Sequence, residues 1–140
     1  MKMKDSKYGM CLYFTSAALA RKVEKLANES WKKVSLSPSH AYLLMAVLEE
    51  PGIQPSALSS MLHLQPSTIT RLIEKLEEKK LLVRTTEGKI TNVYPTPKAK
   101  ELHPKAKECL NHFYQKYSSL LGKDESSRLV TDMGKIADKL

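Results

Sequence analysis

The sequence predicts a mainly α-helical protein with one small β-hairpin. Three observations favour this fold class. Leu, Lys, Glu and Ala are abundant whereas only 5 of the 140 residues are glycine, which favours helices over turn-rich β structure. Two successive segments, beginning at Gln54 and Gln65, open with the same Gln-Pro-Ser sequence and continue with apolar residues at helical spacing. A β-branched run interrupted by the turn signal Glu87-Gly88 follows them and predicts the hairpin.

Composition and charge narrow the functional classes. With 41% apolar and 27% charged residues, the chain can bury a core and form one folded unit. Its 23 basic and 15 acidic residues give a net charge of +8, which favours a polyanionic partner, although many basic proteins bind none. No apolar run is long enough to span a membrane, the N-terminal residues do not resemble a signal peptide, and the two cysteines lie far apart. We therefore expect a cytoplasmic protein with no membrane partner.

The first 50 residues predict two helices. From Tyr8 to Asn28 apolar residues recur at mostly helical spacing with no proline among them, so a long first helix is expected. Ser37 and Pro38 then provide an N-cap and a first helical residue for a second helix, which ends before Pro51-Gly52. This second helix is apolar on nearly every side, so we expect it to be buried.

The two Gln-Pro-Ser segments predict a short helix over 55–62 and a longer one from Pro66 to about Lys79, joined by a tight turn at 63–65. Proline is tolerated at the start of each because the first helical N–H has no partner within the helix. Helical periodicity divides both helices into an inner and an outer face. The residues expected to face inward are Leu58, Met61 and Leu62 in the short helix and Ile69, Leu72, Ile73 and Leu76 in the longer one.

The last third of the chain predicts the hairpin and two more helices. Residues 81–86 and 89–94 are the two predicted strands. Thr96 and Pro97 cap and open a long helix, and we expect a kink near Pro104 because proline removes a helical hydrogen bond. Gly122 is expected to end this helix and Asp124 to cap the last one.

Residues 36–96 have the element order of a winged helix-turn-helix: helix, short helix, tight turn, helix and hairpin. In this arrangement the short helix supports a recognition helix, whose outer face enters the major groove of double-stranded DNA. That outer face carries small hydroxyls and Arg71, which can make a forked contact to a guanine edge, whereas an apolar face would indicate a protein partner. The predicted DNA-binding residues are Gln65, Ser67, Thr68, Thr70, Arg71, Lys75, Arg84 and Lys89.

Both ends of the chain carry surplus apolar stripes. Residues 1–35 and 97–140 hold more apolar residues at helical spacing than one small winged domain can cover, so we expect both ends to form an obligate homodimer. Two-fold pairing would place the DNA half-sites about 10 base pairs apart. The predicted dimerisation residues are Met10, Leu12, Phe14, Leu110, Phe113, Tyr117, Leu129, Met133, Ile136 and Leu140.

A family resemblance rests on residues 36–44, 55–79 and 95–99, and most specifically on the run STITRLIEKLEEK at 67–79. These segments resemble the multiple antibiotic resistance regulator (MarR) family. The resemblance implies a transcriptional repressor that binds a pseudo-palindromic operator as a homodimer. It also implies release of the DNA when a small-molecule effector, or in some members a metal or an oxidant, is bound.

Three features depart from the family pattern. The wing passes from Arg84 to Lys89 without the family's Asp-x-x-Asp-Arg-Arg run, so it is shorter and lacks a tip arginine, which favours contact with a phosphate over contact with bases in the minor groove. Lys80 stands where the recognition helix usually ends in glycine, so Lys80 must be left-handed or the helix must end differently. Tyr13, and not Cys11, falls where oxidant-sensing relatives carry a reactive cysteine, so we interpret Cys11 as a small buried hydrophobe.

Catalytic and metal-binding signatures are absent. The sequence has no nucleophile elbow, zinc-protease motif, phosphate loop or C-x-x-C pair, so we expect neither an enzyme nor a cofactor. Cys109 and His112 share one helix face, but a zinc site needs three or four converging ligands, so we expect Cys109 in the core and no metal site. Two alternatives stay open: a winged helix that contacts protein or RNA, and a metal- or redox-sensing member of the same family.

Overall fold

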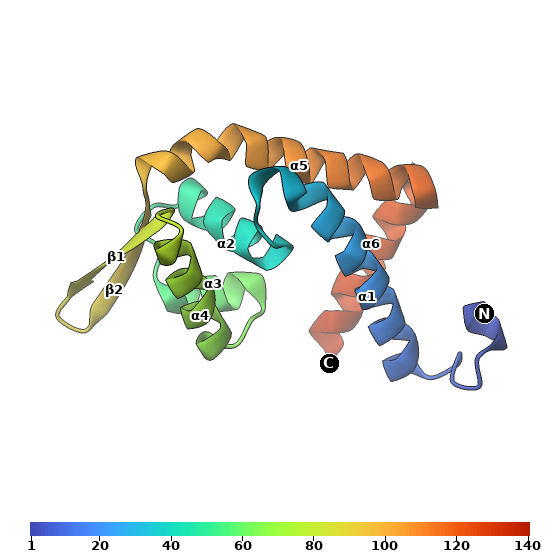
Figure 1. Ribbon diagram of the computed structural model, residues 1–140. Helices are drawn as coiled ribbons and strands as arrows, with labels where there is room; N and C mark the ends of the chain where they lie inside the picture. Colours follow the sequence, from blue (N-terminus) through green and yellow to red (C-terminus); the bar gives the residue numbers. More distant parts are fainter.

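The computed structural model describes residues 1–140 and contains six α-helices, two short 3₁₀ helices (η) and one two-stranded antiparallel sheet (Figure 1). In chain order the elements are η1 (Met3–Asp5), α1 (Leu12–Trp31), η2 (Lys32–Val34), α2 (Pro38–Glu49), α3 (Pro55–Leu62), α4 (Pro66–Glu78), β1 (Leu82–Glu87), β2 (Ile90–Pro95), α5 (Pro97–Leu121) and α6 (Lys123–Lys139). The predicted fold class and every predicted element are therefore confirmed. None of the helices combines the length and the apolarity that crossing a membrane would require.

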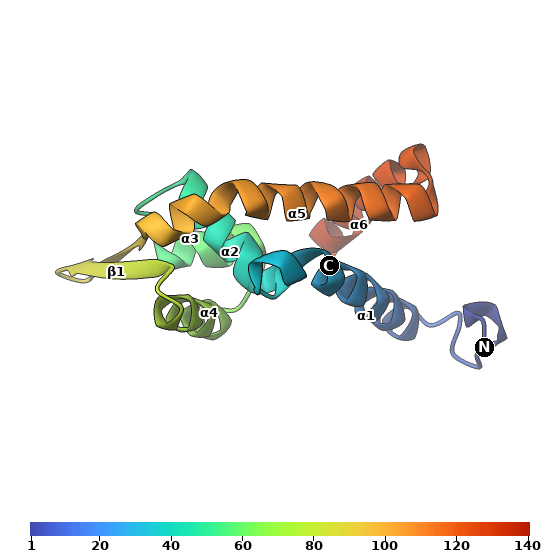
Figure 2. The same ribbon diagram turned by 45° about the horizontal axis from the view of Figure 1, so that its top comes forward.

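Helix α5 is the longest helix and connects two groups of elements (Figures 1 and 2). At its N-terminal end lie α2, α3, α4 and the hairpin, and at its C-terminal end lie α6 and the body of α1. The winged helix-turn-helix and the helical chain ends are thus spatially distinct, although both share α5.

The core lies in the winged helix-turn-helix and is centred on α2. Five consecutive residues of α2, from Leu43 to Val47, are buried, which confirms the expectation for this helix. Only Tyr42 on α2 is an exposed large apolar side chain, and its ring packs edge-on against the fully buried Trp31 at 5.8 Å between centroids. Side chains from α3, α4 and both strands complete this core, with Leu58, Ile69, Ile73, Leu76, Leu82 and Val93 almost fully buried.

The first helix begins four residues later than predicted. Residues 3–10 instead form η1 and a turn, so Met10 precedes the helix and Cys11 is its N-cap. The chain folds back over Gly9, where a Cβ atom would collide with the carbonyl oxygen of Met3. Apolar spacing alone could not reveal this turn because it depends on a backbone contact.

The turn between α3 and α4 has the three residues predicted, 63–65, with His63 in the left-handed region at φ 53°. The inward positions of Leu58 and Leu62 are confirmed as buried and half-buried, but Met61 is half exposed, so that expectation was wrong. At 100° per residue, Met61 lies on the opposite side of Leu58 from Leu62, and the core packs against the side of α3 that carries Leu62.

The hairpin pairs Leu82 with Pro95 at its base and Glu87 with Ile90 at its tip. Both strands lie one residue later than predicted because Leu81 donates its N–H to the carbonyl of Leu76 and so still belongs to the end of α4. Gly88 begins the two-residue loop at φ 64°, a conformation that suits glycine.

Helix α5 is continuous through Pro104, and its axis bends after its first turns, in the region where the kink was expected (Figures 1 and 2). Gly122, at φ 93°, ends the helix as predicted, and its N–H donates to the carbonyl of Ser118 at 2.8 Å. The prediction that Asp124 caps α6 was wrong. Gly122 reverses the chain within one residue, so α6 begins at Lys123 and Asp124 falls in its first turn, where a carboxylate suits the helix dipole.

Candidate nucleic-acid interface

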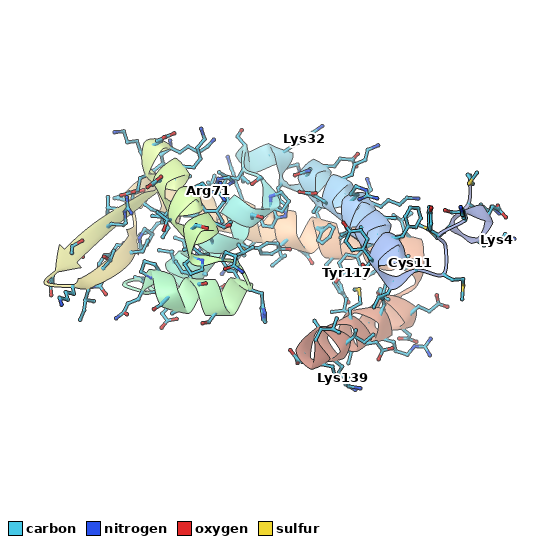
Figure 3. All side chains as sticks on the ribbon, turned by 90° about the horizontal axis from the view of Figure 1, so that it is seen from below. Lys4, Cys11, Lys32, Arg71, Tyr117 and Lys139 are labelled. Atoms are coloured by element: carbon cyan, nitrogen blue, oxygen red, sulfur yellow. The ribbon has the colours of Figure 1, made fainter.

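Helix α4 has one buried and one exposed face, as its periodicity predicts. Ile69, Leu72, Ile73 and Leu76 are buried, whereas Ser67, Thr70, Arg71 and Glu74 are exposed. Figure 3 looks onto α4 from below and shows Arg71 far from Tyr117, which lies toward the helical chain ends. The exposed face of α4 is therefore available to a partner and carries no large apolar side chain.

The N-terminal half of α4 presents short polar groups. Gln65 is the N-cap residue, with an exposed side chain that makes no capping hydrogen bond. The hydroxyl of Thr70 donates to the carbonyl of Pro66 at 3.1 Å, and its oxygen remains free to accept. Ser67 is exposed and Thr68 is half-buried on the flank. The helix N-terminus, with its partial positive charge, is thus open to an anion.

Basic side chains around α4 differ in how they are paired. Arg71 forms no ion pair, whereas Lys75 lies 3.5 Å from the Glu78 carboxylate in an exposed pair of little strength. Arg84, on β1, lies 2.8 Å from the carboxylate of Glu77 on α4. Arg71 is therefore free to contact a ligand, while Arg84 braces the wing against the recognition helix.

The tip of the wing carries Lys89, which is exposed and unpaired in the two-residue loop. The hairpin projects away from the rest of the molecule (Figure 1), so its tip can approach a surface beside the one that α4 contacts. The sequence predicted this position, but it did not predict that Arg84 pairs with Glu77, because the pair joins different elements.

His40 is a residue near α4 that the sequence analysis did not select. Its Nδ1 atom lies 2.5 Å from the Ser37 hydroxyl oxygen at the start of α2. Partial burial lowers the pKa of His40 below its ordinary value of 6.5, and the positive charges of Lys79 and Lys75 lower it further. His40 therefore favours the neutral form, and its protonation would add charge beside α4.

The C-terminal end of α4 contacts two other segments, the start of α5 and the residue that follows η2. Lys80 is left-handed at φ 62°, the first of the two outcomes expected at this position. Its carbonyl accepts a hydrogen bond from the Thr96 hydroxyl at 2.8 Å, and the carbonyl of Lys79 accepts one from the Lys98 ammonium at 3.0 Å. The Lys79 ammonium in turn donates to the carbonyl of Ser35 at 3.4 Å.

The residues predicted for dimerisation fall into two groups. Leu110, Phe113 and Tyr117 are half-buried on α5, and Phe14 is half-buried near the start of α1, where its ring centroid lies 5.9 Å from that of Tyr8. The others remain exposed: Met10, Leu12, Leu129, Met133, Ile136 and Leu140. An apolar groove of about 460 Å³ lies between α1, α5 and α6. Its lining includes Leu19, Leu120, Leu129, Val130 and Met133.

A second hollow, of about 450 Å³, lies between α2 and α5. Its lining is aromatic, with Tyr42, Tyr114 and Tyr117, and it also includes Lys107 and Asn111. Burial raises the pKa of Tyr42, and Tyr117 raises it further, so the Tyr42 phenol stays protonated and able to donate. The lining of this hollow is therefore mostly apolar and aromatic, with the tyrosine hydroxyls, the Asn111 amide and the Lys107 ammonium as its polar groups.

The cysteines and histidines do not gather in one place: within the chain, no three His, Cys, Asp or Glu side chains lie close enough together to hold a metal ion. Cys109 is buried as expected, and burial raises the pKa of its thiol. His112 lies 3.3 Å from the Ser30 hydroxyl instead of facing another ligand. The expectation that Cys11 is buried was wrong, because its position before α1 leaves it exposed.

Comparison with known proteins gives a consistent result. Residues 34–89 match the model of the MarR family. The chain is 28% identical to the HTH-type transcriptional regulator YybA of Bacillus subtilis over 89 residues, which cover 61% of this chain and 59% of YybA. It is 24% identical to the HTH-type transcriptional repressor MdtR of Bacillus subtilis over 123 residues, which cover 86% of this chain and 79% of MdtR.

Solved structures share the fold across the whole chain. The repressor CouR bound to p-coumaroyl-CoA superimposes with a TM-score of 0.86 at 20% identity, covering 99% of this chain and all of that one. CouR bound to a 23-mer DNA duplex gives a TM-score of 0.84 at 20% identity, covering 98% of each chain. At this identity the likeness establishes the fold of this chain.

Proposed function

We propose that the chain, whose residues 34–89 match the MarR family of transcriptional regulators, binds a specific double-stranded DNA sequence as a homodimer and represses transcription there. One observation carries the proposal: the exposed half of α4 combines short hydroxyl side chains with the unpaired Arg71. A protein-binding helix would instead expose large apolar side chains at these positions.

Helix α4 enters the major groove with its N-terminal half foremost. Ser67 and Thr70 are short enough to let the helix approach the base edges, and Arg71 donates two hydrogen bonds to the N7 and O6 atoms of a guanine. Lys89, at the tip of the wing, contacts a phosphate, which adds affinity without sequence preference. The complex of CouR with a DNA duplex supports a DNA-binding role for this fold.

The dimer forms through the helical chain ends. The exposed side chains of Met133 and Ile136 and the apolar groove beside α6 offer a surface that a second copy of the chain would cover. Two-fold symmetry then presents two α4 helices to successive major grooves, with half-site centres about 10 base pairs apart.

The hollow between α2 and α5 is the site proposed for an effector. Its tyrosines suit an aromatic or lipophilic molecule, and Lys107 suits an acidic group on it. Because α2 supports α4 and α5 belongs to the dimer, a molecule between them favours one spacing of the two recognition helices. A ligand that prefers the wrong spacing releases the DNA. The complex of CouR with p-coumaroyl-CoA supports this proposal.

A selection of bound fragments from random duplex DNA tests the proposed function. We expect enrichment of a pseudo-palindromic sequence with half-sites about one helical turn apart. Titration of the purified protein against the selected and a scrambled duplex, at stated salt, then measures the specificity ratio. No enrichment, or equal affinity for both duplexes, would contradict sequence-specific binding.

A further inference from the structure

We propose that Thr96 and Lys98 form a latch that fixes the C-terminal end of the recognition helix α4 to the first turn of α5, and so sets the spacing of the two recognition helices in the dimer. The inference rests on the proposed function, because the spacing matters only if the dimer binds two half-sites. Thr96 and Lys98 are positioning residues: they contact α4 and not the DNA.

The need for a latch arises from the way in which α4 ends. The N–H of Lys80 donates to the carbonyl of Glu77, and the N–H of Leu81 donates to the carbonyl of Leu76, both at 2.9 Å. This is the Schellman arrangement, which requires a left-handed residue at position 80. The carbonyls of Lys79 and Lys80 are left beyond the helix, without helical partners.

Both of these carbonyls accept hydrogen bonds from side chains at the start of α5. The Thr96 hydroxyl donates to the carbonyl of Lys80 at 2.8 Å, and the Lys98 ammonium donates to the carbonyl of Lys79 at 3.0 Å. The Thr96 oxygen also accepts the N–H of Ala99 at 3.2 Å, so one side chain both caps α5 and holds the end of α4. Position 96 therefore requires a hydroxyl, which can donate and accept at once.

The latch provides a direct connection that the covalent chain lacks. Between Lys80 and Thr96 the chain runs out along β1 and back along β2, whereas the hydrogen bond from the Thr96 hydroxyl joins these two residues directly. The backbone reinforces the contact, because the N–H of Thr96 donates to the carbonyl of Leu81 at 3.1 Å. The Lys79 ammonium reaches the carbonyl of Ser35, directly after η2.

Helix α4 is thus attached to two segments that lead into the chain ends, α5 and the segment after α1. A rotation of α5 in the dimer is transmitted to α4 through these hydrogen bonds, while the N-terminal half of α4 remains free for DNA. Without the latch, each recognition helix would follow the dimer less closely, and the preference for one half-site spacing would weaken.

The experiment compares four single variants with the wild-type protein. Thr96→Val removes the hydroxyl, and Thr96→Ser retains it. Lys98→Met removes the second donor but leaves the cap of α5 intact. Lys100→Met removes the same charge from the same turn, where the exposed Lys100 side chain makes no hydrogen bond, so it controls for the loss of attraction to DNA.

Affinities are measured for the duplex selected by the wild-type protein and for duplexes with one base pair inserted or removed between the half-sites. We expect Thr96→Val to lose roughly 2- to 10-fold in affinity for the correctly spaced duplex. We expect Lys98→Met to lose more affinity than Lys100→Met does. Both latch variants should also discriminate less between correct and incorrect spacing, whereas Thr96→Ser should match the wild type.

One further measurement separates the alternative outcomes. Thermal unfolding shows whether Thr96→Val merely weakens the fold. If it does, Lys98→Met, which retains the cap of α5, shows whether the hydrogen bonds to the end of α4 set the preference for half-site spacing. Equal spacing discrimination by Lys98→Met and Lys100→Met would overturn the latch while leaving DNA binding intact. A wild-type protein that prefers no duplex would overturn the proposed function, and this inference with it.

Discussion

Arg71 is the single side chain from which sequence preference is expected. It lies on the exposed face of α4, one turn after the helix start, and has no acidic partner. Because Arg71 has no ion pair to break before it binds, its forked contact to a guanine adds directly to the discrimination between duplexes.

Replacement of Arg71 with alanine should reduce affinity for the selected duplex by about 1 to 3 kcal/mol and relax the preference at one base pair of each half-site. Folding should be unchanged because the side chain is exposed. Fluorescence titrations with specific and scrambled duplexes measure both effects, and Arg128→Ala, on the exposed surface of α6, is the control for lost charge. Unchanged affinity for the specific duplex would remove Arg71 from the interface.

His40 makes the stability of the protein depend on pH. Burial lowers its pKa below 6.5, with Lys79 and Lys75 adding to the effect, so the unfolded chain binds a proton at this residue more readily than the folded chain does. The free energy of unfolding should therefore fall as the pH falls from 6.5 toward the folded-state pKa, and this contribution should be fully present above 6.5. Urea unfolding of wild type and His40→Asn between pH 8 and 5 measures it. Parallel pH dependences of the two proteins would show that His40 does not contribute.

At the scale of elements, the wing and the recognition helix act as one unit. The pair between Arg84 and Glu77 joins β1 to α4, and the isolated bridge between Ile53 and Val93 joins β2 to the segment before α3. The short hairpin is therefore anchored at its base, and only its tip is free to contact DNA.

Replacement of Lys89 with alanine should weaken binding to specific and unspecific duplexes alike and make the dependence of log K on log salt shallower by about one. The reason is that a lysine at the tip of a short wing contacts a phosphate and not a base. Titrations at several salt concentrations test this, with Lys139→Ala as a control at the far end of the molecule (Figure 3). A loss confined to one duplex sequence would show instead that the wing contacts bases.

The end of α4 contains backbone strain that can be removed. Lys80 occupies the left-handed region at φ 62°, where a residue with a Cβ atom is disfavoured. Lys80→Gly should raise the free energy of unfolding by about 1 kcal/mol, while Lys80→Ala, which retains the Cβ atom, should not. Chemical denaturation of the three proteins gives the comparison. A glycine variant no more stable than the alanine variant would mean that strain at this position is negligible.

Local patterns predicted the elements of this fold well. The two Gln-Pro-Ser starts gave the bounds of α3 and the start of α4, and the spacing of Ile69, Leu72, Ile73 and Leu76 gave the buried face of α4. What local patterns missed depends on contacts between distant residues. The Arg84–Glu77 pair joins two elements, and the late start of α1 depends on the turn around Gly9. The spacing of apolar residues along the sequence carries no information about such contacts.

At the scale of the whole molecule, the chain in isolation leaves apolar surface exposed. Leu129, Val130, Met133 and Ile136 lie exposed on α6, and the groove beside them is lined almost wholly by apolar side chains. At roughly 25 cal/mol per Å² of buried apolar surface, covering these faces with a second copy would stabilise a dimer by several kcal/mol. DNA binding through two half-sites then depends on this association.

Met133→Asp with Ile136→Asp should convert the dimer to a monomer, because two carboxylates would be buried without partners. The matched control is Ser127→Asp with Thr131→Asp, which adds the same charge to the opposite side of α6. Sedimentation equilibrium of the three proteins measures the change, and DNA titration should show specific binding lost only in the first double variant. A wild-type protein that sediments as a monomer, or tight operator binding by a monomeric variant, would contradict the obligate dimer.

The only tryptophan of the chain lies where it can report on the proposed effector site. Trp31 is fully shielded from solvent, and its ring contacts Tyr42, which lines the hollow between α2 and α5. Its emission should therefore be blue-shifted in the folded protein, and a molecule that displaces Tyr42 should change its quantum yield. The protein thus carries its own fluorophore, so a library of aromatic acids can be screened without any label.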